Sequence, residues 1–80
     1  MTEQSIFEQL KEIIVEQMGV PPHVVTPEAR LVQDLGCDSL DIIEILIEVE
    51  DTFEIQVSDD DAARISTVAE AVAAIEKLKA

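Results

Sequence analysis

Cysteine and histidine, the side chains typical of disulfides and zinc sites, are nearly absent from this sequence of 80 residues. It contains one cysteine, Cys37, and one histidine, His23, which excludes an intrachain disulfide and leaves no set of zinc ligands. We expect Cys37 to be a small side chain packed beside a turn and His23 to be a solvated loop residue. The sequence contains neither the ligand spacing of an EF-hand nor a glycine-rich phosphate-binding loop, so no metal site is predicted.

Basic residues are scarce as well. There are 5 of them against 18 acidic residues, which gives a formal net charge of −13. This charge repels nucleic acid and anionic membrane surfaces, and it favours a basic protein partner and a monomeric state. The imbalance is strongest between Leu31 and Ala63, where there is no lysine or arginine and where 11 of the 18 acidic residues lie.

Long apolar runs are missing too. No stretch approaches the length of a membrane span and no secretory segment opens the chain, so we expect a cytoplasmic protein. Residues 1–80 predict a single domain, which is too small for a deep enzyme cleft with its own catalytic residues. Because 48% of the residues are apolar, the chain should fold, and with only Phe7 and Phe53 as aromatic residues its core should be aliphatic.

The spacing of the apolar residues predicts a first helix from Thr2 or Ser5 to Met18, ended by Gly19. Residues 19–37 hold all three prolines and both glycines and predict one long loop. The loop residues expected to pack against the core are Val20, Val24, Val25, Leu31, Val32 and Leu35.

The second helix should begin at Asp38 or Ser39 and end at Thr52 or Phe53, followed by an extended connector at residues 54–57. Ser58 is the expected cap of a short third helix. Thr67 and Glu70 have the spacing of a capping box for a last helix that reaches residues 77–79. The predicted fold is therefore all-α: a four-helix bundle with three longer helices, one short third helix and a long loop after the first helix.

Two apolar stripes run along the predicted second helix. The stripe typical of a core-facing surface consists of Ile42, Ile45, Leu46, Val49 and Phe53. The second lies on roughly the opposite side and consists of Leu40, Ile43 and Ile47, with Glu44, Glu50, Asp51 and Glu54 around it. Either the long loop covers this second stripe, or the stripe is an exposed surface for protein docking. The surrounding charge of one sign favours docking to a basic partner.

Residues 34–41, with the sequence DLGCDSLD, place Ser39 just after a glycine turn and at the start of the second helix. The unpaired N–H groups and the positive end of the dipole at a helix start suit an attached phosphodiester. Ser39 could instead simply cap the helix, but Asp38 together with Asp41 can already do so. No histidine or lysine lies close in sequence to activate the hydroxyl. His23 could approach through the loop, but the pair would still lack an orienting group and an oxyanion hole, so a serine hydrolase is not predicted. A serine modified by another enzyme needs no such residues.

These residues resemble the attachment motif of the acyl carrier proteins, in particular the discrete type used in fatty acid synthesis. The resemblance extends along the chain, through residues 17–20, 48–53, 57–59 and 65–68. It implies that Ser39 carries 4′-phosphopantetheine, transferred from coenzyme A by a phosphopantetheinyl transferase. It further implies that the protein is a shuttle for acyl chains and not an enzyme.

The resemblance also implies roles for the residues around Ser39. Those that would contact the transferase and basic-surfaced fatty acid synthesis enzymes are Asp38, Leu40, Asp41, Ile43, Glu44, Ile47, Glu50 and Asp51. Those that would line a cavity for the acyl chain are Ile42, Ile45, Leu46, Val49, Ala62, Ile65, Val68 and Ala71.

Three positions depart from the common family pattern. Cys37 stands where alanine is most common, Ser58 where proline is common, and Ile42 where threonine is common. They leave the pathway open, so a carrier for a polyketide or another specialised acyl pathway is an alternative. The alternative from a different class is an unmodified acidic helical adaptor that docks basic proteins.

Overall fold

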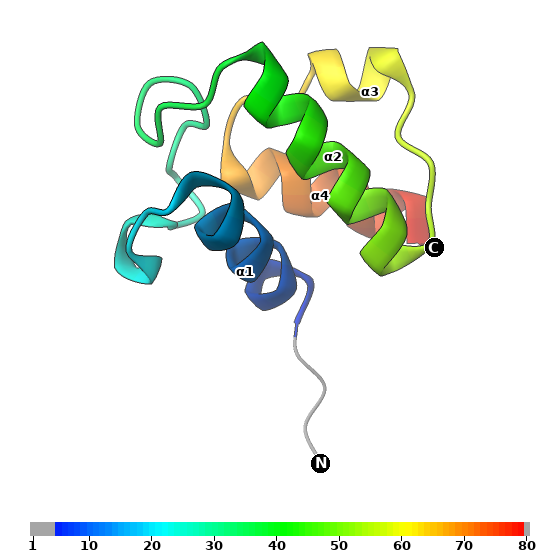
Figure 1. The fold of residues 1–80 in the computed structure, drawn as a ribbon. Helices are drawn as coiled ribbons and strands as arrows, with labels where there is room; N and C mark the ends of the chain where they lie inside the picture. Colours follow the sequence, from blue (N-terminus) through cyan, green and yellow to red (C-terminus); the bar gives the residue numbers. More distant parts are fainter. Residues whose placement is uncertain (1–4, 80) are drawn as a thin grey trace.

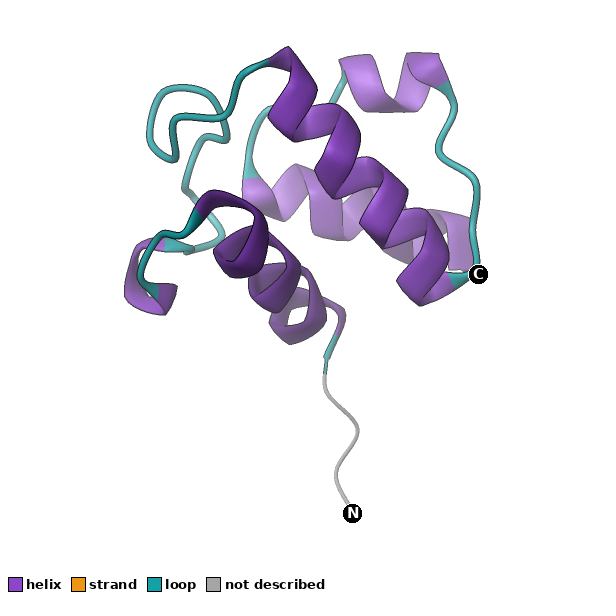
Figure 2. Cartoon of the chain, viewed as in Figure 1, coloured by secondary structure: helices purple, strands orange, loops and turns teal. Residues whose placement is uncertain are grey.

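The computed structural model describes residues 5–79, and the predicted all-α fold is confirmed (Figure 1). The helices are α1 (Ile6–Met18), the short 3₁₀ helix η1 (Pro22–Val24), α2 (Ser39–Phe53), α3 (Asp59–Ala63) and α4 (Val68–Lys79). No strand occurs within residues 5–79, and the connector after α2 is a loop that begins with Glu54 in the left-handed conformation, φ 57° (Figure 2). None of the helices in this part of the chain has the length and apolar character needed to cross a bilayer.

The helix ends follow the polar signals that were read from the sequence. The Ser5 hydroxyl accepts the N–H of Glu8 at the start of α1, and Gly19 ends that helix in the left-handed conformation with φ 69°. The Thr67 hydroxyl accepts the N–H of Glu70, whose carboxylate accepts the N–H of Thr67 in return, so the capping box of α4 is confirmed. The alternative first cap, Thr2, lies outside the described residues.

The core lies between the three longer helices. α1 contacts both α2 and α4, and the side chains with almost no exposure are Leu10, Ile14, Val25, Val49 and Val68. α3 contributes no buried residue, because it is a short helix on the side of the bundle. In Figure 1, α4 lies behind α2, and the α1–α2 loop lies beside the N-terminal end of α2.

The long loop packs on the core through fewer residues than expected. Val25, Leu31 and Leu35 are buried, but Val24 is 36% and Val32 is 55% exposed, so for these two the prediction was wrong. Val32 lies in the turn at residues 31–35, where the inward positions of its neighbours force its own side chain outward. The helix η1 was also not expected; a proline at its first position is compatible with a helix start.

Backbone hydrogen bonds attach this loop to the start of α4. The N–H of Leu31 donates to the carbonyl of Ser66 at 2.9 Å, and the N–H of Val68 donates to the carbonyl of Ala29 at 2.9 Å. The loop is also closed on itself, because the carboxylate of Asp34 accepts the backbone N–H of Arg30 at 2.8 Å and pairs with its guanidinium at 3.3 Å. These bonds, that of the backbone N–H first, lower the pKa of the Asp34 carboxyl. The part of the loop that leads to Ser39 is therefore held at residues 29–34.

Candidate functional site

Ser39 is the first residue of α2, and its side chain is exposed. The cap of the helix is supplied by its neighbours: an Asp38 carboxylate oxygen accepts the N–H of Asp41 at 2.9 Å, and an Asp41 carboxylate oxygen accepts the N–H of Asp38 at 3.1 Å. The predicted acidic capping box is thus present, and it relieves Ser39 of the capping role that a serine at this place often has. The hydroxyl of Ser39 remains available for chemistry.

The turn before Ser39 is fixed by Gly36 and Cys37. Gly36 has φ 76°, which favours glycine, and the N–H of Cys37 donates to the carbonyl of Leu31 at 2.9 Å. The Cys37 side chain is 3% exposed, which confirms its expected packing beside the turn. Burial raises the pKa of the Cys37 thiol, and the negative charges of Asp41 and Asp38 raise it further. Cys37 is therefore an anchor for the turn and a poor nucleophile.

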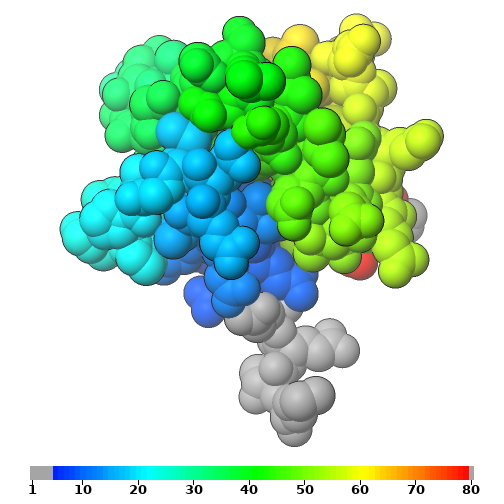
Figure 3. Space-filling view, in the orientation of Figure 1, coloured from blue at the N-terminus to red at the C-terminus, as the bar shows by residue number. Residues whose placement is uncertain are grey.

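The second apolar stripe of α2 is exposed. Leu40, Ile43 and Ile47 are 62%, 53% and 58% exposed, so the alternative in which the long loop covers them is wrong. In the space-filling view α2 crosses the front of the molecule with no other segment over it (Figure 3). The stripe begins one residue after Ser39, so a protein bound to it would also lie against Ser39.

The acidic residues near this stripe fall into two groups. Glu44 and Asp51 are exposed, although the amide of Gln17 on α1 donates a hydrogen bond to the Glu44 carboxylate. Glu50 is half-buried, and its carboxylate accepts the N–H of Val57 at 2.7 Å. Its carboxylate is therefore engaged with the connector after α2, and a sequence reading of α2 by itself carries no signal of this contact.

An apolar cavity lies beneath α2. Its volume is about 20 Å³, little more than the roughly 10–15 Å³ that a single water molecule needs, so it has no room for a hydrocarbon chain. Seven of the eight residues assigned to a cavity from the sequence line it: Ile42, Ile45, Leu46, Val49, Ala62, Ile65 and Ala71. The eighth, Val68, is fully buried elsewhere in the core. The lining also includes Leu10, Ile14, Leu31, Val57, Ala74 and Ile75, several of which could have been found from the apolar stripes of the first and last helices.

Comparison with known proteins agrees with this geometry. The family described as "Phosphopantetheine attachment site" matches residues 8–75. The chain is 47% identical to an acyl carrier protein of Solidesulfovibrio magneticus over 75 residues, which cover 94% of this chain and 96% of that protein. It is 43% identical to an acyl carrier protein of Akkermansia muciniphila over 79 residues, which cover 99% of both chains.

The chain belongs to the acyl carrier protein family. Its cofactor is accordingly phosphopantetheine, and it is a carrier and not an enzyme. Acyl chains, and the enzymes that load and unload them, are the partners that this role requires.

The residues at the start of α2 of this acyl carrier protein fit a phosphodiester. Within residues 5–79, the N–H groups of Ser39 and Leu40 have no acceptor, and both residues are exposed. Ser5 and Ser58 use their hydroxyls as caps, and the N–H of Ser66 donates to Glu70. Ser39 is thus the described serine whose hydroxyl and neighbouring N–H groups are all available to an anion.

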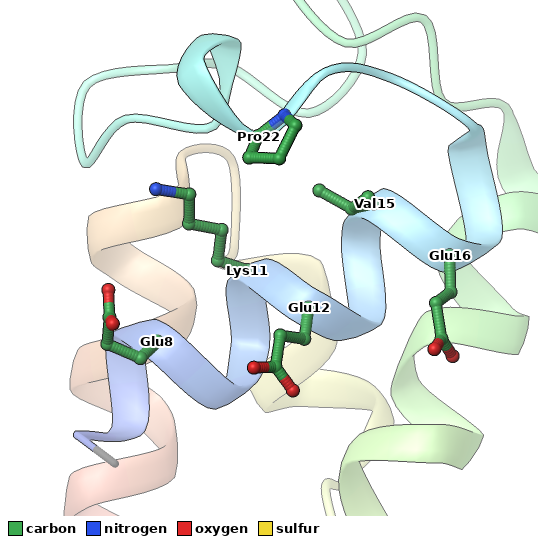
Figure 4. A pocket seen from close by; sticks show the side chains of 6 residues that line it. All are labelled: Glu8, Lys11, Glu12, Val15, Glu16 and Pro22. Carbon is green, nitrogen blue, oxygen red and sulfur yellow. The ribbon is translucent and has the colours of Figure 1, made fainter.

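A larger hollow of about 380 Å³ lies on the outer side of α1, but it does not involve Ser39 or the stripe of α2 (Figure 4). Lys11 and Val15 point toward Pro22 across it, whereas Glu12 and Glu16 point away. It is a surface depression, and three of the six residues that line it are glutamates. Among the described residues there is also no cluster of three or more side chains suited to a metal ion.

Proposed function

We propose that Ser39 is the attachment site of 4′-phosphopantetheine and that the protein carries growing acyl chains to the enzymes of fatty acid synthesis. The observation that supports this most directly is the free hydroxyl of Ser39 beside two unpaired N–H groups. In the transfer from coenzyme A, a bond forms between Ser39 Oγ and phosphorus, the pyrophosphate bond breaks, and adenosine 3′,5′-bisphosphate leaves. The proton of the hydroxyl would pass to a base of the transferase, because the Asp38 and Asp41 carboxylates beside Ser39 are engaged in the capping box.

The attached group supplies a terminal thiol that holds acyl chains as thioesters. The protein's part is to present this group and to shield the chain. The N–H groups of Ser39 and Leu40 would face the phosphodiester and favour its negative charge. The apolar cavity between the helices would receive the hydrocarbon, since each exposed CH₂ group costs about 0.8 kcal/mol in water.

The exposed stripe of Leu40, Ile43 and Ile47 would be the surface that partner enzymes contact, with Asp38, Asp41, Glu44 and Asp51 attracting their basic residues. Glu50 would take part mainly by holding the connector. The role in fatty acid synthesis, in preference to a polyketide or other specialised pathway, is supported by the sequence pattern at residues 34–41. A cytoplasmic location is consistent with a lone, unpaired Cys37.

Intact-mass measurement tests the attachment site. The purified chain is incubated with coenzyme A, Mg²⁺ and a phosphopantetheinyl transferase of broad specificity. We expect the wild-type chain to gain the mass of one phosphopantetheine group and Ser39→Ala to gain none. The matched control is Ser58→Ala, which removes another exposed serine at a helix start and should still gain the group. A mass gain by Ser39→Ala, or none by the wild type, would contradict the proposal.

The pathway is tested separately with the modified protein. Loaded with an acyl group and combined with purified fatty acid synthesis enzymes, it should support chain elongation at a rate similar to that of a fatty acid synthesis carrier protein. Successful attachment at Ser39 without elongation would instead favour a specialised acyl pathway.

A further inference from the structure

The interior cavity has one wall that is much less firmly held than the others. Its lining comes mostly from α1, α2 and α4, which have buried residues along their length. Val57, Ala62 and Ile65 belong instead to the segment from residue 54 to residue 67, in which no residue is buried. Since the cavity is about 20 Å³, a hydrocarbon chain can enter only if part of its wall moves. The segment with the least burial is the wall that moves at the lowest cost.

One side-chain contact holds this wall against α2. A carboxylate oxygen of Glu50 accepts the backbone N–H of Val57 at 2.7 Å, and the bond is partly buried. The other hydrogen bonds of residues 54–67 that reach outside the segment lie at its two ends. Ile55 N–H donates to the Glu50 carbonyl at the end of α2, and residues 66 and 67 bond to Leu31 and Glu70. Between these ends, the bonds other than that of Val57 join residues of the segment itself. The bond acts directly on the cavity, because Val57 itself lines it.

We propose that Glu50 is a latch that keeps the cavity closed, so that its bond to Val57 sets how readily the cavity admits a hydrocarbon chain. Breaking the bond frees the connector, and Val57, Ala62 and Ile65 can then move away from α2. Glu50 is thus a positioning residue that limits the capacity of the cavity. Its effect on acyl chains rests on the proposed function, whereas the opening of the cavity to apolar molecules does not.

The test uses the unmodified chain, so that it is independent of Ser39. Glu50→Ala removes the acceptor of the Val57 N–H, whereas Glu50→Gln keeps an oxygen that can accept it. The control is Glu48→Ala, which removes one charge from an exposed position of the same helix. Amide hydrogen exchange of Val57 reports the latch directly. A partly buried hydrogen bond to a charged group corresponds to about 10–100-fold in an opening equilibrium, so Glu50→Ala should accelerate this exchange by about that factor.

The second measurement is binding of 1-decanol, followed by the chemical shifts of the methyl groups of Ala62 and Ile65. We expect Glu50→Ala to bind it more tightly than the wild type, by up to the same factor of about 10–100, because the open state is more populated. Glu50→Gln should lie between the two, and Glu48→Ala should match the wild type. A purely structural role for Glu50 would loosen the fold without tightening this binding.

Three results would each overturn the latch. The first is unchanged amide exchange at Val57 in Glu50→Ala, and the second is decanol binding by Glu50→Ala that is unchanged or weaker. The third is the same gain in decanol affinity in Glu48→Ala. Attachment of phosphopantetheine at Ser39 is measured separately, on the wild-type chain. If the wild type gains no phosphopantetheine, the proposed attachment site is wrong. The decanol result would still hold, because it is measured on the unmodified chain.

Discussion

Ile45 and Ile47 present the same side chain from the same helix in opposite environments. Ile45 is 4% exposed and lines the interior cavity, whereas Ile47 is 58% exposed in the outer stripe. Substituting each with alanine removes the same atoms and the same β-branch. We therefore expect Ile45→Ala to lose stability and keep partner binding, and Ile47→Ala to do the reverse.

The two free-energy changes follow from exposure. For Ile45→Ala, the loss of about 3 buried carbon atoms costs about 2.4 kcal/mol, and the enlarged cavity brings the total to about 3–4 kcal/mol. In a domain of this size, such a loss lowers Tm by about 12–32 °C. For Ile47→Ala, the apolar contact that can be lost is worth at most about 1 kcal/mol. The better helix propensity of alanine offsets about 0.4 kcal/mol of this.

Urea unfolding followed by circular dichroism measures the first property, and titration of the unmodified chain with the transferase measures the second. Truncating an apolar anchor of an interface costs more than about 1 kcal/mol, so Ile47→Ala should weaken binding about fivefold or more. If Ile45→Ala is too unstable to purify, Ile45→Val gives a graded version with a loss of about 0.5–1.5 kcal/mol.

One result would refute the assignment of the two faces of α2. If Ile47→Ala lowers the free energy of unfolding as much as Ile45→Ala does, the outer stripe is covered in solution. Equal binding by wild type and Ile47→Ala would show instead that the exposed stripe is not the surface that the transferase contacts.

Three further predictions concern charge and titration. Asp51→Lys should weaken transferase binding several-fold at low salt and little at high salt. The control Glu28→Lys makes the same change of charge in the loop and should leave transferase binding unchanged. Equal effects of the two substitutions would mean that only the net charge matters. The pKa of the Asp34 carboxyl is lower in the folded chain than in the unfolded chain, where it is about 3.9. The contacts of Asp34 with Arg30 therefore stabilise the fold above about pH 3.9. This stabilisation is lost as the pH falls through the pKa of the folded chain. Thermal melts of Asp34→Asn should therefore depend less on pH in the acid range, and an unaltered dependence would contradict this. Burial raises the pKa of the Cys37 thiol in the folded chain, so unfolding is favoured as the pH rises through about 8.5, the thiol pKa in the unfolded chain. Alkylation of Cys37 should also be slower in the native chain than in urea. Equal alkylation rates would show that the thiol is not protected.

The helix boundaries could be predicted because their signals are local. The Asp38–Asp41, Ser58–Asp61 and Thr67–Glu70 pairs each join residues within one helical turn, and every one of these contacts is present. Ser39 could be singled out for the same reason, since its exposure follows from a glycine turn and a capped helix start only a few residues long.

The remaining features depend on contacts between distant segments. The exposure of Val32 depends on the path of the loop, and so does that of the second stripe of α2, for which the sequence allowed either a covering loop or an exposed docking surface. The position of Val68 outside the cavity depends on how α4 packs against α1, and the bond from Glu50 to Val57 depends on how the connector turns back. None of these has a periodic or short-range signal in the sequence.

The attachment of the long loop to α4 has a consequence for the order in which the site forms. The bonds from Leu31 to Ser66 and from Val68 to Ala29 join segments more than thirty residues apart, and the turn that holds Ser39 continues from this clamped region. On the ribosome, residues 66–68 are made long after Ser39 has left the peptidyl transferase centre. The turn before Ser39 can therefore reach its final shape only after residues 66–68 have been synthesised and have bonded to the loop, so we expect the proposed modification of Ser39 to require this part of the fold.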